Sequence, residues 1–190
     1  MRVMLRPQQT WETERLLARP AASADAKVVF EQYASDAVVA RFMTWKPHRS
    51  TDETLEFLSR CERVWHDGSA FPWCLWLKAS GDLAGLLEIR VCGSSVDLGY
   101  ALVRRWWGQG LMTEALRPVV QWALDQPQIH RIWATCDVEN LASARVLERV
   151  GMEREGVLRR WMVHPNISEI PRDSLCYSIV KSANTAPSPP

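Results

Sequence analysis

The stretch of sequence that decides the fold is VRRWWGQGLMTEA, residues 103–115. It reads as the end of a strand, a turn with two glycines and the start of a helix. Such a turn can bind phosphate, because free amides at a helix N-terminus carry partial positive charge and glycines let a ligand approach the backbone. Arg104 and Arg105 add charged donors. Alternatively, Gly108 and Gly110 only form a tight turn, since short glycine motifs often arise by chance.

Strand and helix patterns alternate on both sides of this stretch. Apolar and polar residues alternate over three segments before it, which predicts antiparallel strands, and helical spacing follows it. The pattern indicates a mixed α/β fold around one sheet, mostly antiparallel and flanked by helices. We predict strands over 15–19, 71–78, 83–91, 96–103, 132–138, 152–161 and 175–180, and helices from Ser23, over 36–42, from the Ser50–Glu53 capping box to Gly68, over 110–125 and over 141–150.

Length and charge exclude several classes of protein. The chain has 190 residues, which favours one domain, and 47% of them are hydrophobic, which is enough for a core without disulfides. Lys and Arg number 23 against 22 Asp and Glu, so the net charge is +1. With so small a net charge, the chain has no overall electrostatic field that would attract nucleic acid or an anionic membrane. An anion site must therefore be local.

The cysteines and histidines are too scattered to indicate a metal or disulfide framework. Five cysteines without CxxC spacing fit a reducing compartment, and the four histidines lack HxxxH or HExxH spacing. No apolar segment has the length of a membrane span or of a signal peptide core. We expect a cytoplasmic protein with no metal, nucleic-acid partner or membrane partner.

The frame Arg105-x-x-Gly108-x-Gly110 lacks the Walker and dinucleotide-binding patterns, and it resembles the RxxGxG/A pyrophosphate loop of the GNAT acetyltransferases. The resemblance continues through residues 12–180 in the same order, which makes it far more specific than one motif. It points to the RimJ/RimL-type branch of ribosomal-protein N-terminal acetyltransferases. The further segments that carry it are 14–20, 97–100, 112–115, 139–143, 151–156 and 172–178.

The resemblance implies an N-acetyltransferase that transfers acetyl from acetyl-CoA to a primary amine. The GNAT sheet is splayed around the acyl-CoA, between the strand ending at Val103 and the strand over 132–138. Asn140 matches a residue that bonds the pantetheine, although Asn also suits a helix N-cap. The implied cofactor-binding residues are Ala101, Leu102, Val103, Arg104, Arg105, Gly108, Gln109, Gly110, Leu111, Met112, Asn140 and Ser143.

Two residues are candidates for proton transfer. Ser143 falls where this branch has a serine near the acetyl sulfur, able to protonate the leaving thiolate, but a first-turn serine can also bond locally. Tyr100 and Tyr177 are competing donors, although a strand tyrosine is more often packed. Glu88 is our candidate for the general base, because a carboxylate in an apolar run needs a partner or a role. Asp97 is the alternative base, and Glu88 can also lie on a solvated strand face.

The acceptor is predicted only by class. We expect residues 45–48 and 161–170 to form the rim that contacts it. The branch resemblance favours the α-amine of a protein or peptide; a small-molecule amine, or an inactive acyl-CoA-binding module, is the alternative. The cysteines have no expected catalytic role, and the chain can be a monomer or a homodimer. We expect an N-terminal extension over 1–11, the acetyltransferase domain over 12–180 and a disordered tail over 181–190.

Overall fold

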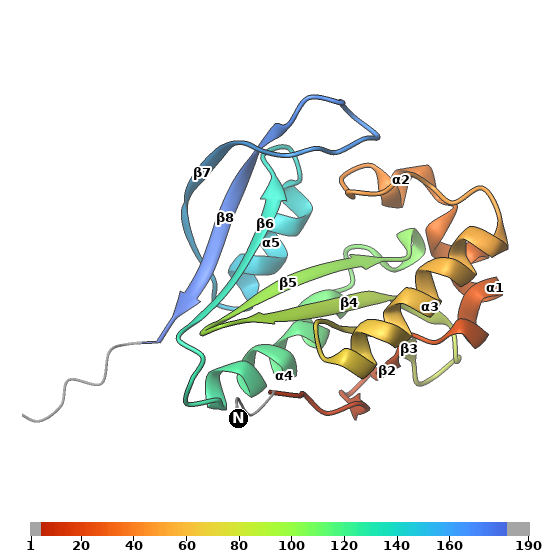
Figure 1. The fold of residues 1–190 in the computed structure, drawn as a ribbon, viewed down its shortest axis with the longest axis horizontal. Helices are drawn as coiled ribbons and strands as arrows, with labels where there is room; N and C mark the ends of the chain where they lie inside the picture. The colour runs from red at the N-terminus through yellow and green to blue at the C-terminus, as the bar shows by residue number, and fades with distance from the viewer. Residues whose placement is uncertain (1–4, 182–190) are drawn as a thin grey trace, which may run out of the picture.

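A computed structural model describes residues 5–181, and its strands form one sheet of eight (Figure 1). Neighbouring strands are antiparallel except β5 and β6, which run parallel. The mixed, mostly antiparallel sheet predicted from the sequence is thereby confirmed. In the order of the sheet, the strands are β1 (Trp11–Glu12), β2 (Leu16–Pro20), β3 (Phe71–Leu77), β4 (Leu83–Cys92), β5 (Ser95–Leu102), β6 (Arg131–Asp137), β8 (Arg172–Val180) and β7 (Glu153–Met162).

Helices cover both faces of the sheet. Leu87 of β4 packs in one core cluster with Leu116, whereas its neighbour Leu86 packs in a second cluster with Leu58. Successive strand residues point to opposite faces, so each cluster belongs to one face. The helices are α4 (Leu111–Asp125) and α5 (Leu141–Arg149) on the first face and α1 (Ala26–Val29), α2 (Ala37–Ala40) and α3 (Thr51–Asp67) on the second, with short turns η1 (Ser23–Asp25), η2 (Phe30–Ala34) and η3 (Arg104–Trp106).

The elements agree with the sequence predictions except near the N-terminus. Strand β1 has two residues and was not predicted. The helix predicted from Ser23 is divided into a 3-10 turn, one α-helical turn and a π-helical turn. Its β-branched and aromatic side chains lose rotamer freedom in a helix, so packing decides its geometry. Helix α4 contains Pro118 in its interior and continues through it to Asp125.

Both ends of α3 are closed by the residues that the sequence singles out. The Ser50 hydroxyl accepts the amide of Glu53 at 3.3 Å, as in a capping box. The Glu53 carboxylate, however, accepts the amide of Arg49 at 2.8 Å instead of that of Ser50. At the other end Gly68 has a φ of 76°, and its amide bonds Val64 O at 2.9 Å. Only glycine adopts this left-handed conformation without steric cost.

The two edges of the sheet are short or irregular. Strand β1 forms one edge with two residues, and β7 forms the other. The pairing of β7 with β8 shifts register between Arg154 and Gly156 and again between Leu158 and Met162. Arg160, inside the second shift, has a φ of 49°. Strand β7 is therefore bent at two places along its length.

The described ends of the chain lie against the fold. The Arg6 guanidinium donates to the carbonyl oxygens of Trp65 and His66 at 2.8 and 2.7 Å. At the other end, the Lys181 amide donates to His130 O at 3.0 Å. The remainder of the disordered tail predicted over 181–190 lies outside the described residues. The predicted extension and domain boundaries stay predictions.

Replacing Ser50 by alanine removes the cap of α3, and we expect a loss of about 1 kcal/mol in the free energy of unfolding. Urea denaturation should show a lower midpoint with an unchanged slope. Ser80→Ala, in an exposed turn, is the matched control. An unfolding midpoint for Ser50→Ala equal to that of the wild type would show that the cap does not stabilise the helix.

Candidate active site

The sheet opens between β5 and β6 (Figure 1). Their parallel pairing covers three residue pairs, from Ser95 opposite Arg131 to Asp97 opposite Trp133. Beyond Asp97 the facing edge of β5 has no strand partner among residues 5–181. Backbone amides and carbonyls along such an edge need other partners. At the end of β5, however, the Leu102 carbonyl accepts the Trp107 indole N–H at 2.9 Å, the Val103 amide donates to Ala84 O at 2.9 Å, and the Val103 carbonyl accepts the Trp106 amide at 3.0 Å. The pantetheine contacts expected at Ala101, Leu102 and Val103 stay a prediction.

The glycine turn after β5 leaves space for a ligand at the start of α4. Gly108 and Gly110 have φ angles of 75° and 77°. A Cβ on Gly108 would meet nothing within 4 Å, and one on Gly110 would meet only the Arg15 guanidinium at 3.8 Å. Gly110 is the N-cap and offers no side-chain bond, so the first amides of the helix, at Leu111 and Met112, point outward without a side-chain cap. This geometry suits a pyrophosphate.

The two arginines of the turn bond protein groups. Arg105 donates to Gln32 at 2.8 Å and pairs with Asp82 at 3.2 Å. Arg104 lies 3.8 Å from the Asp36 carboxylate. Both side chains are about half exposed. Their role as phosphate ligands stays a prediction, and Arg105 would have to leave Asp82 to fulfil it.

A residue that the sequence analysis did not single out braces the same turn. Arg15 of the β1–β2 connection donates to the Glu114 carboxylate at 2.7 Å and to Gln109 O at 3.1 Å. Thr13 adds a bond to Glu114 at 2.5 Å. Glu114 lies in the first turn of α4, where a carboxylate also interacts favourably with the helix dipole. These contacts join the N-terminal segment to the glycine turn.

Ser143 lies between the parted strands. Its hydroxyl is 2.9 Å from the Tyr100 hydroxyl of β5, and the Cys136 sulfur of β6 is within hydrogen-bond reach of its side chain. Its amide donates to the Asn140 side chain at 3.2 Å, so Asn140 is an N-cap of α5. Burial raises the pKa of the Cys136 thiol to about 11, despite the Ser143 hydrogen bond, and it also raises the pKa of Tyr100. Both groups stay protonated near neutral pH. Tyr177, the other candidate donor, instead bonds Glu148.

Glu88 lies on the opposite face of the sheet from Tyr100, because it shares the face of Leu86. Arg90 donates to Glu88 at 2.7 Å and to Asp97 at 2.7 Å, which joins the two predicted base candidates. Burial raises the pKa of both carboxyls, although Arg90 opposes the shift. A carboxylate of raised pKa is a stronger proton acceptor than an exposed one.

A small aromatic cavity lies on this second face. Its volume is about 30 Å³, room for two water molecules or a small group. The ring of Trp45 lies 5.7 Å from that of Tyr33 and 5.5 Å from that of His48. Trp45 and His48, predicted as rim residues, are thus half-buried cavity walls. Phe57, Ala34 and Arg60 complete the lining, and the Arg60 charge also acts on Glu88.

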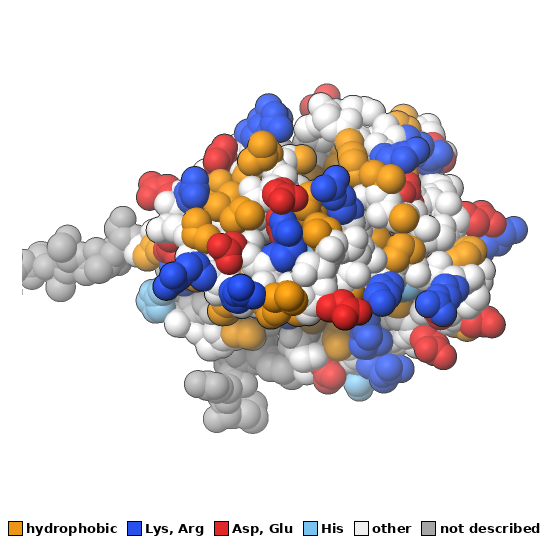
Figure 2. Space-filling view, turned by 90° about the horizontal axis from the view of Figure 1, so that it is seen from above, with side chains coloured by type: hydrophobic (Ala, Val, Ile, Leu, Met, Phe, Trp, Pro, Cys, Tyr) orange, Lys and Arg blue, Asp and Glu red, His pale blue; other side chains and the backbone are white. Residues whose placement is uncertain are grey.

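The loop between β7 and β8, residues 163–171, crosses the mouth of the site. The Asn166 amide donates to Ala40 O at 2.6 Å and to Trp45 O at 2.8 Å, which ties the loop to the end of α2. Trp161 and Ile170, from the predicted rim, are 47% and 59% exposed. Figure 2 shows a face on which apolar, basic and acidic side chains are interspersed, so charge alone does not select an acceptor there.

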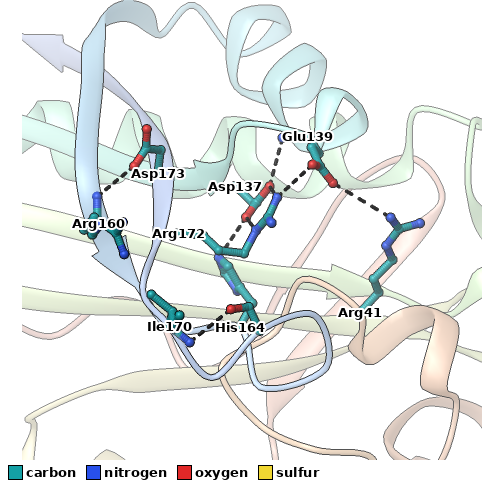
Figure 3. Close-up of polar contacts among 9 residues, drawn as sticks. Arg41, Asp137, Glu139, Arg160, His164, Ile170, Arg172 and Asp173 are labelled. Carbon is teal, nitrogen blue, oxygen red and sulfur yellow. Dashed lines mark hydrogen bonds and ion pairs between the residues drawn. The ribbon is translucent and has the colours of Figure 1, made fainter.

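An ion pair with a buried carboxylate lies beside this loop (Figure 3). The Asp137 side chain is fully buried, and Arg172 donates to its two oxygens at 2.6 and 3.1 Å. Burial alone would raise the pKa of Asp137, but the bonds from Arg172 and from the Glu139 amide lower it. His164 of the loop lies 3.8 Å from the same carboxylate. The sequence analysis did not single out Asp137 or His164.

Parted strands beside a glycine turn at a helix start are the arrangement that the resemblance to acyl-CoA transferases predicts. The sequence model described as an acetyltransferase (GNAT) domain matches residues 15–153. The chain therefore belongs to the GNAT acetyltransferases, and it is an acetyl-CoA-dependent N-acetyltransferase. The resemblance to the GNAT acetyltransferases, which the sequence motifs indicated, is thereby confirmed.

Relatives and solved structures match almost the whole chain. It is 25% identical over 173 residues to the uncharacterized N-acetyltransferase YoaA of Bacillus subtilis (strain 168), covering 90% of this chain and 96% of YoaA. It is 26% identical over 166 residues to the ribosomal protein uS5-alanine N-acetyltransferase of Escherichia coli (strain K12), covering 83% and 84%. The structure of the microcin C7 self immunity acetyltransferase MccE in complex with acetyl-CoA and AMP matches with a TM-score of 0.80 at 20% identity, covering 89% and 94%.

Neither a metal-binding cluster nor a membrane-spanning helix occurs in the described part of the chain. Residues 5–181 contain no group of three or more His, Cys, Asp or Glu side chains placed to hold a metal ion. Within the same residues, no helix is long and apolar enough to cross a membrane.

Replacing Gly110 by tryptophan should abolish acetyl-CoA binding, because the ring would fill the space in front of the helix amides. The φ of 77° adds strain, so Gly93→Trp is the matched control: Gly93 has a φ of 62°, similarly open surroundings and a position in the β4–β5 turn. Isothermal titration calorimetry on both folded variants measures the affinity. If Gly110→Trp binds acetyl-CoA with wild-type affinity, the glycine turn is not part of the binding site.

Proposed function

We propose that this N-acetyltransferase acetylates the α-amine of a protein or peptide in the cytoplasm. The observation that carries the proposal is the mouth between β5 and β6, with Ser143 near one face and Glu88 near the other. A thioester held between them has a proton donor for its leaving thiolate on the Ser143 side and the acceptor amine on the Glu88 side. The name of the Escherichia coli relative, an alanine N-acetyltransferase of ribosomal protein uS5, supports a protein acceptor.

The acyl-CoA is proposed to bind along three segments. The backbone of Ala101, Leu102 and Val103 would bond the pantetheine amides, with help from Asn140. The pyrophosphate would lie on the amides of residues 108–112, with Arg104 and Arg105 as charged donors. The glycine turn has open space and uncapped helix amides, which supports the pyrophosphate position. At Leu102 the pantetheine would have to replace the Trp107 indole, which now bonds the Leu102 carbonyl. No metal is needed for this binding.

The proposed chemistry is direct attack by a neutral amine on the thioester carbonyl carbon. The new C–N bond forms as the C–S bond breaks, and the electron pair of the broken bond goes to sulfur. Ser143, aligned by the hydroxyl of Tyr100, donates a proton to that sulfur. Glu88, whose pKa is raised by burial, accepts through water the one proton that the nitrogen loses. Glu88 then releases this proton to solvent and solvent restores the proton of Ser143, so the reaction consumes and releases no net proton.

Acid–base energetics favour an α-amine over a lysine side chain. An α-amino group has a pKa of about 7.7 to 8.0, so neutralising it at pH 7 costs about 1 kcal/mol. Neutralising lysine, with a pKa near 10.4, costs about 4.6 kcal/mol. Because Glu88 is already paired with Arg90, the smaller cost suits this site better. The aromatic cavity beside Glu88 also has room for only a small first side chain.

Replacing Ser143 by alanine should lower kcat by about 10²- to 10⁴-fold with little change in KM, because its proton is needed only as the C–S bond breaks. Tyr100→Phe should give a smaller loss, since it only aligns Ser143. Steady-state release of free thiol measures both variants. A kcat for Ser143→Ala equal to that of the wild type would show that Ser143 has no role in catalysis.

Short peptides with free N-termini should be acetylated at the α-amine, and blocking that amine should suppress the reaction even when lysines are present. Mass spectrometry of the products locates the label. Acetyl on lysine, or a non-peptide amine with a much higher kcat/KM, would favour the small-molecule alternative. Acetyl-CoA binding without thiol release for any amine would favour an inactive binding module.

A further inference from the structure

The aromatic cavity beside Glu88 contains polar atoms that no described residue bonds. Tyr33 lines the cavity and is 5% exposed, and its hydroxyl has no hydrogen-bond partner among residues 5–181. His48 also lines the cavity. Its Nδ1 lies 2.8 Å from the Thr54 hydroxyl oxygen, whereas Nε2 bonds no residue that the structure describes. Polar groups enclosed in this way need a partner, which here is water or a ligand.

The bond to Thr54 determines which nitrogen of His48 carries the proton. The Thr54 hydroxyl has a single hydrogen, and it donates that hydrogen to Ser50 O in a long bond of 3.5 Å. The same hydroxyl therefore accepts the Nδ1 proton, and Nε2 presents a lone pair to the cavity. Burial lowers the pKa of His48, although Glu53 opposes the shift, so the imidazole is neutral near pH 7. Burial raises the pKa of Tyr33, so its hydroxyl keeps its proton.

These atoms match a hydroxyl group better than other small polar groups. A hydroxyl donates one hydrogen bond, here to His48 Nε2, and accepts another, here from the Tyr33 hydroxyl. A carboxylate has no hydrogen for Nε2, and an ammonium group would be repelled by the charge of Arg60, which also lines the cavity. The volume of about 30 Å³ admits a hydroxyl with its carbon atom and excludes a large apolar side chain such as that of leucine.

The cavity adjoins Glu88, the proposed proton acceptor. Leu86 of β4 packs in the same core cluster as Tyr33 and Trp45, and Glu88 lies two residues further along the strand on the same face. The charge of Glu88 acts on Tyr33, and the charge of Arg60 acts on Glu88. An acceptor amine that passes its proton toward Glu88 therefore has the cavity within reach of the group on its neighbouring carbon atom.

We infer that the cavity binds a hydroxyl group of the acceptor, and that His48 and Tyr33 select acceptors that carry one. The acceptor is then a vicinal amino alcohol, in which the amine and the hydroxyl are on adjacent carbon atoms or on the two carbons of a serine backbone and side chain. An N-terminal serine or threonine of a peptide carries this group, and so does a small molecule such as ethanolamine. The inference deepens the proposed function and rests on its placing of the amine near Glu88.

The first test compares kcat/KM for peptides that differ only in their first residue. Threonine and valine have the same shape and differ by a hydroxyl against a methyl group, and serine against alanine repeats the comparison without the branch. The hydroxyl peptide of each pair should be better by at least about tenfold, because the other leaves Nε2 of His48 and the Tyr33 hydroxyl unpaired. Leucine should be the poorest. Equal values within both pairs, or a preference for aspartate, which Arg60 would attract, would overturn the inference.

Two substitutions at position 48 separate the roles of the two ring nitrogens. His48→Asn keeps an amide at the place of Nδ1 and has no group at Nε2, so it should lose most of the preference for serine over alanine. His48→Gln reaches as far as Nε2 and should keep part of it. Tyr33→Phe should lower the preference as well, and His130→Asn, which changes an exposed histidine, should keep the wild-type ratio.

The ratio of two kcat/KM values does not depend on the amount of active enzyme, so a purely structural defect leaves it unchanged. Thermal unfolding reports whether each variant is folded. A folded His48→Asn with the wild-type preference for serine would overturn the inference.

Failure of the proposed function gives a different result. A chain that acetylates no peptide but prefers ethanolamine to propylamine, which has a methyl group in place of the hydroxyl, would overturn the peptide α-amine proposal and support the hydroxyl site. Peptides that are acetylated at the α-amine with equal kcat/KM for serine and alanine, and for threonine and valine, would support the α-amine proposal and overturn the hydroxyl site.

Discussion

The architecture depends on the parting of β5 and β6 after three parallel residue pairs. A sheet normally satisfies the backbone groups of its inner strands, and here the facing edges are left open in its middle. The strands stay connected on their other sides, β5 to β4 and β6 to β8, so the opening costs no other pairing. Helices α4 and α5 stand on one side of the opening. The aromatic cavity and the loop 163–171 stand on the other.

Ion pairs between residues far apart in the sequence join the glycine turn and the strands around the loop 163–171 to this frame. Arg15 and Glu114 join the N-terminal segment to the glycine turn, and they are separated by 99 positions in the sequence. Asp137 and Arg172 join the end of β6 to the loop over the mouth. Each pair is close to a backbone segment with little regular hydrogen bonding. The glycine turn and the surroundings of the loop 163–171 are therefore held by charge as well as by packing.

The sequence predicted the locally determined features well. Ser50 and Gly68 mark the ends of α3 through bonds within a few residues, and Gly110 marks the start of α4. The splay of the sheet came only from the family resemblance. Contacts between distant segments could not be read from spacing: Arg105 bonds Asp82, and His164 lies within the predicted rim with no pattern to distinguish it. Such contacts depend on the folded arrangement of many elements.

The irregular edges of the sheet have a consequence for the behaviour of the protein at high concentration. A long, straight edge strand offers a ladder on which a second molecule can add its own strand. Strand β7 interrupts that ladder twice, at its two register shifts, and β1 is too short to offer one. Intermolecular strand addition is thus disfavoured at both ends of the sheet. Most side chains of β7 are exposed, so this strand is accessible to other molecules. Its two register shifts nevertheless disfavour aggregation by strand addition.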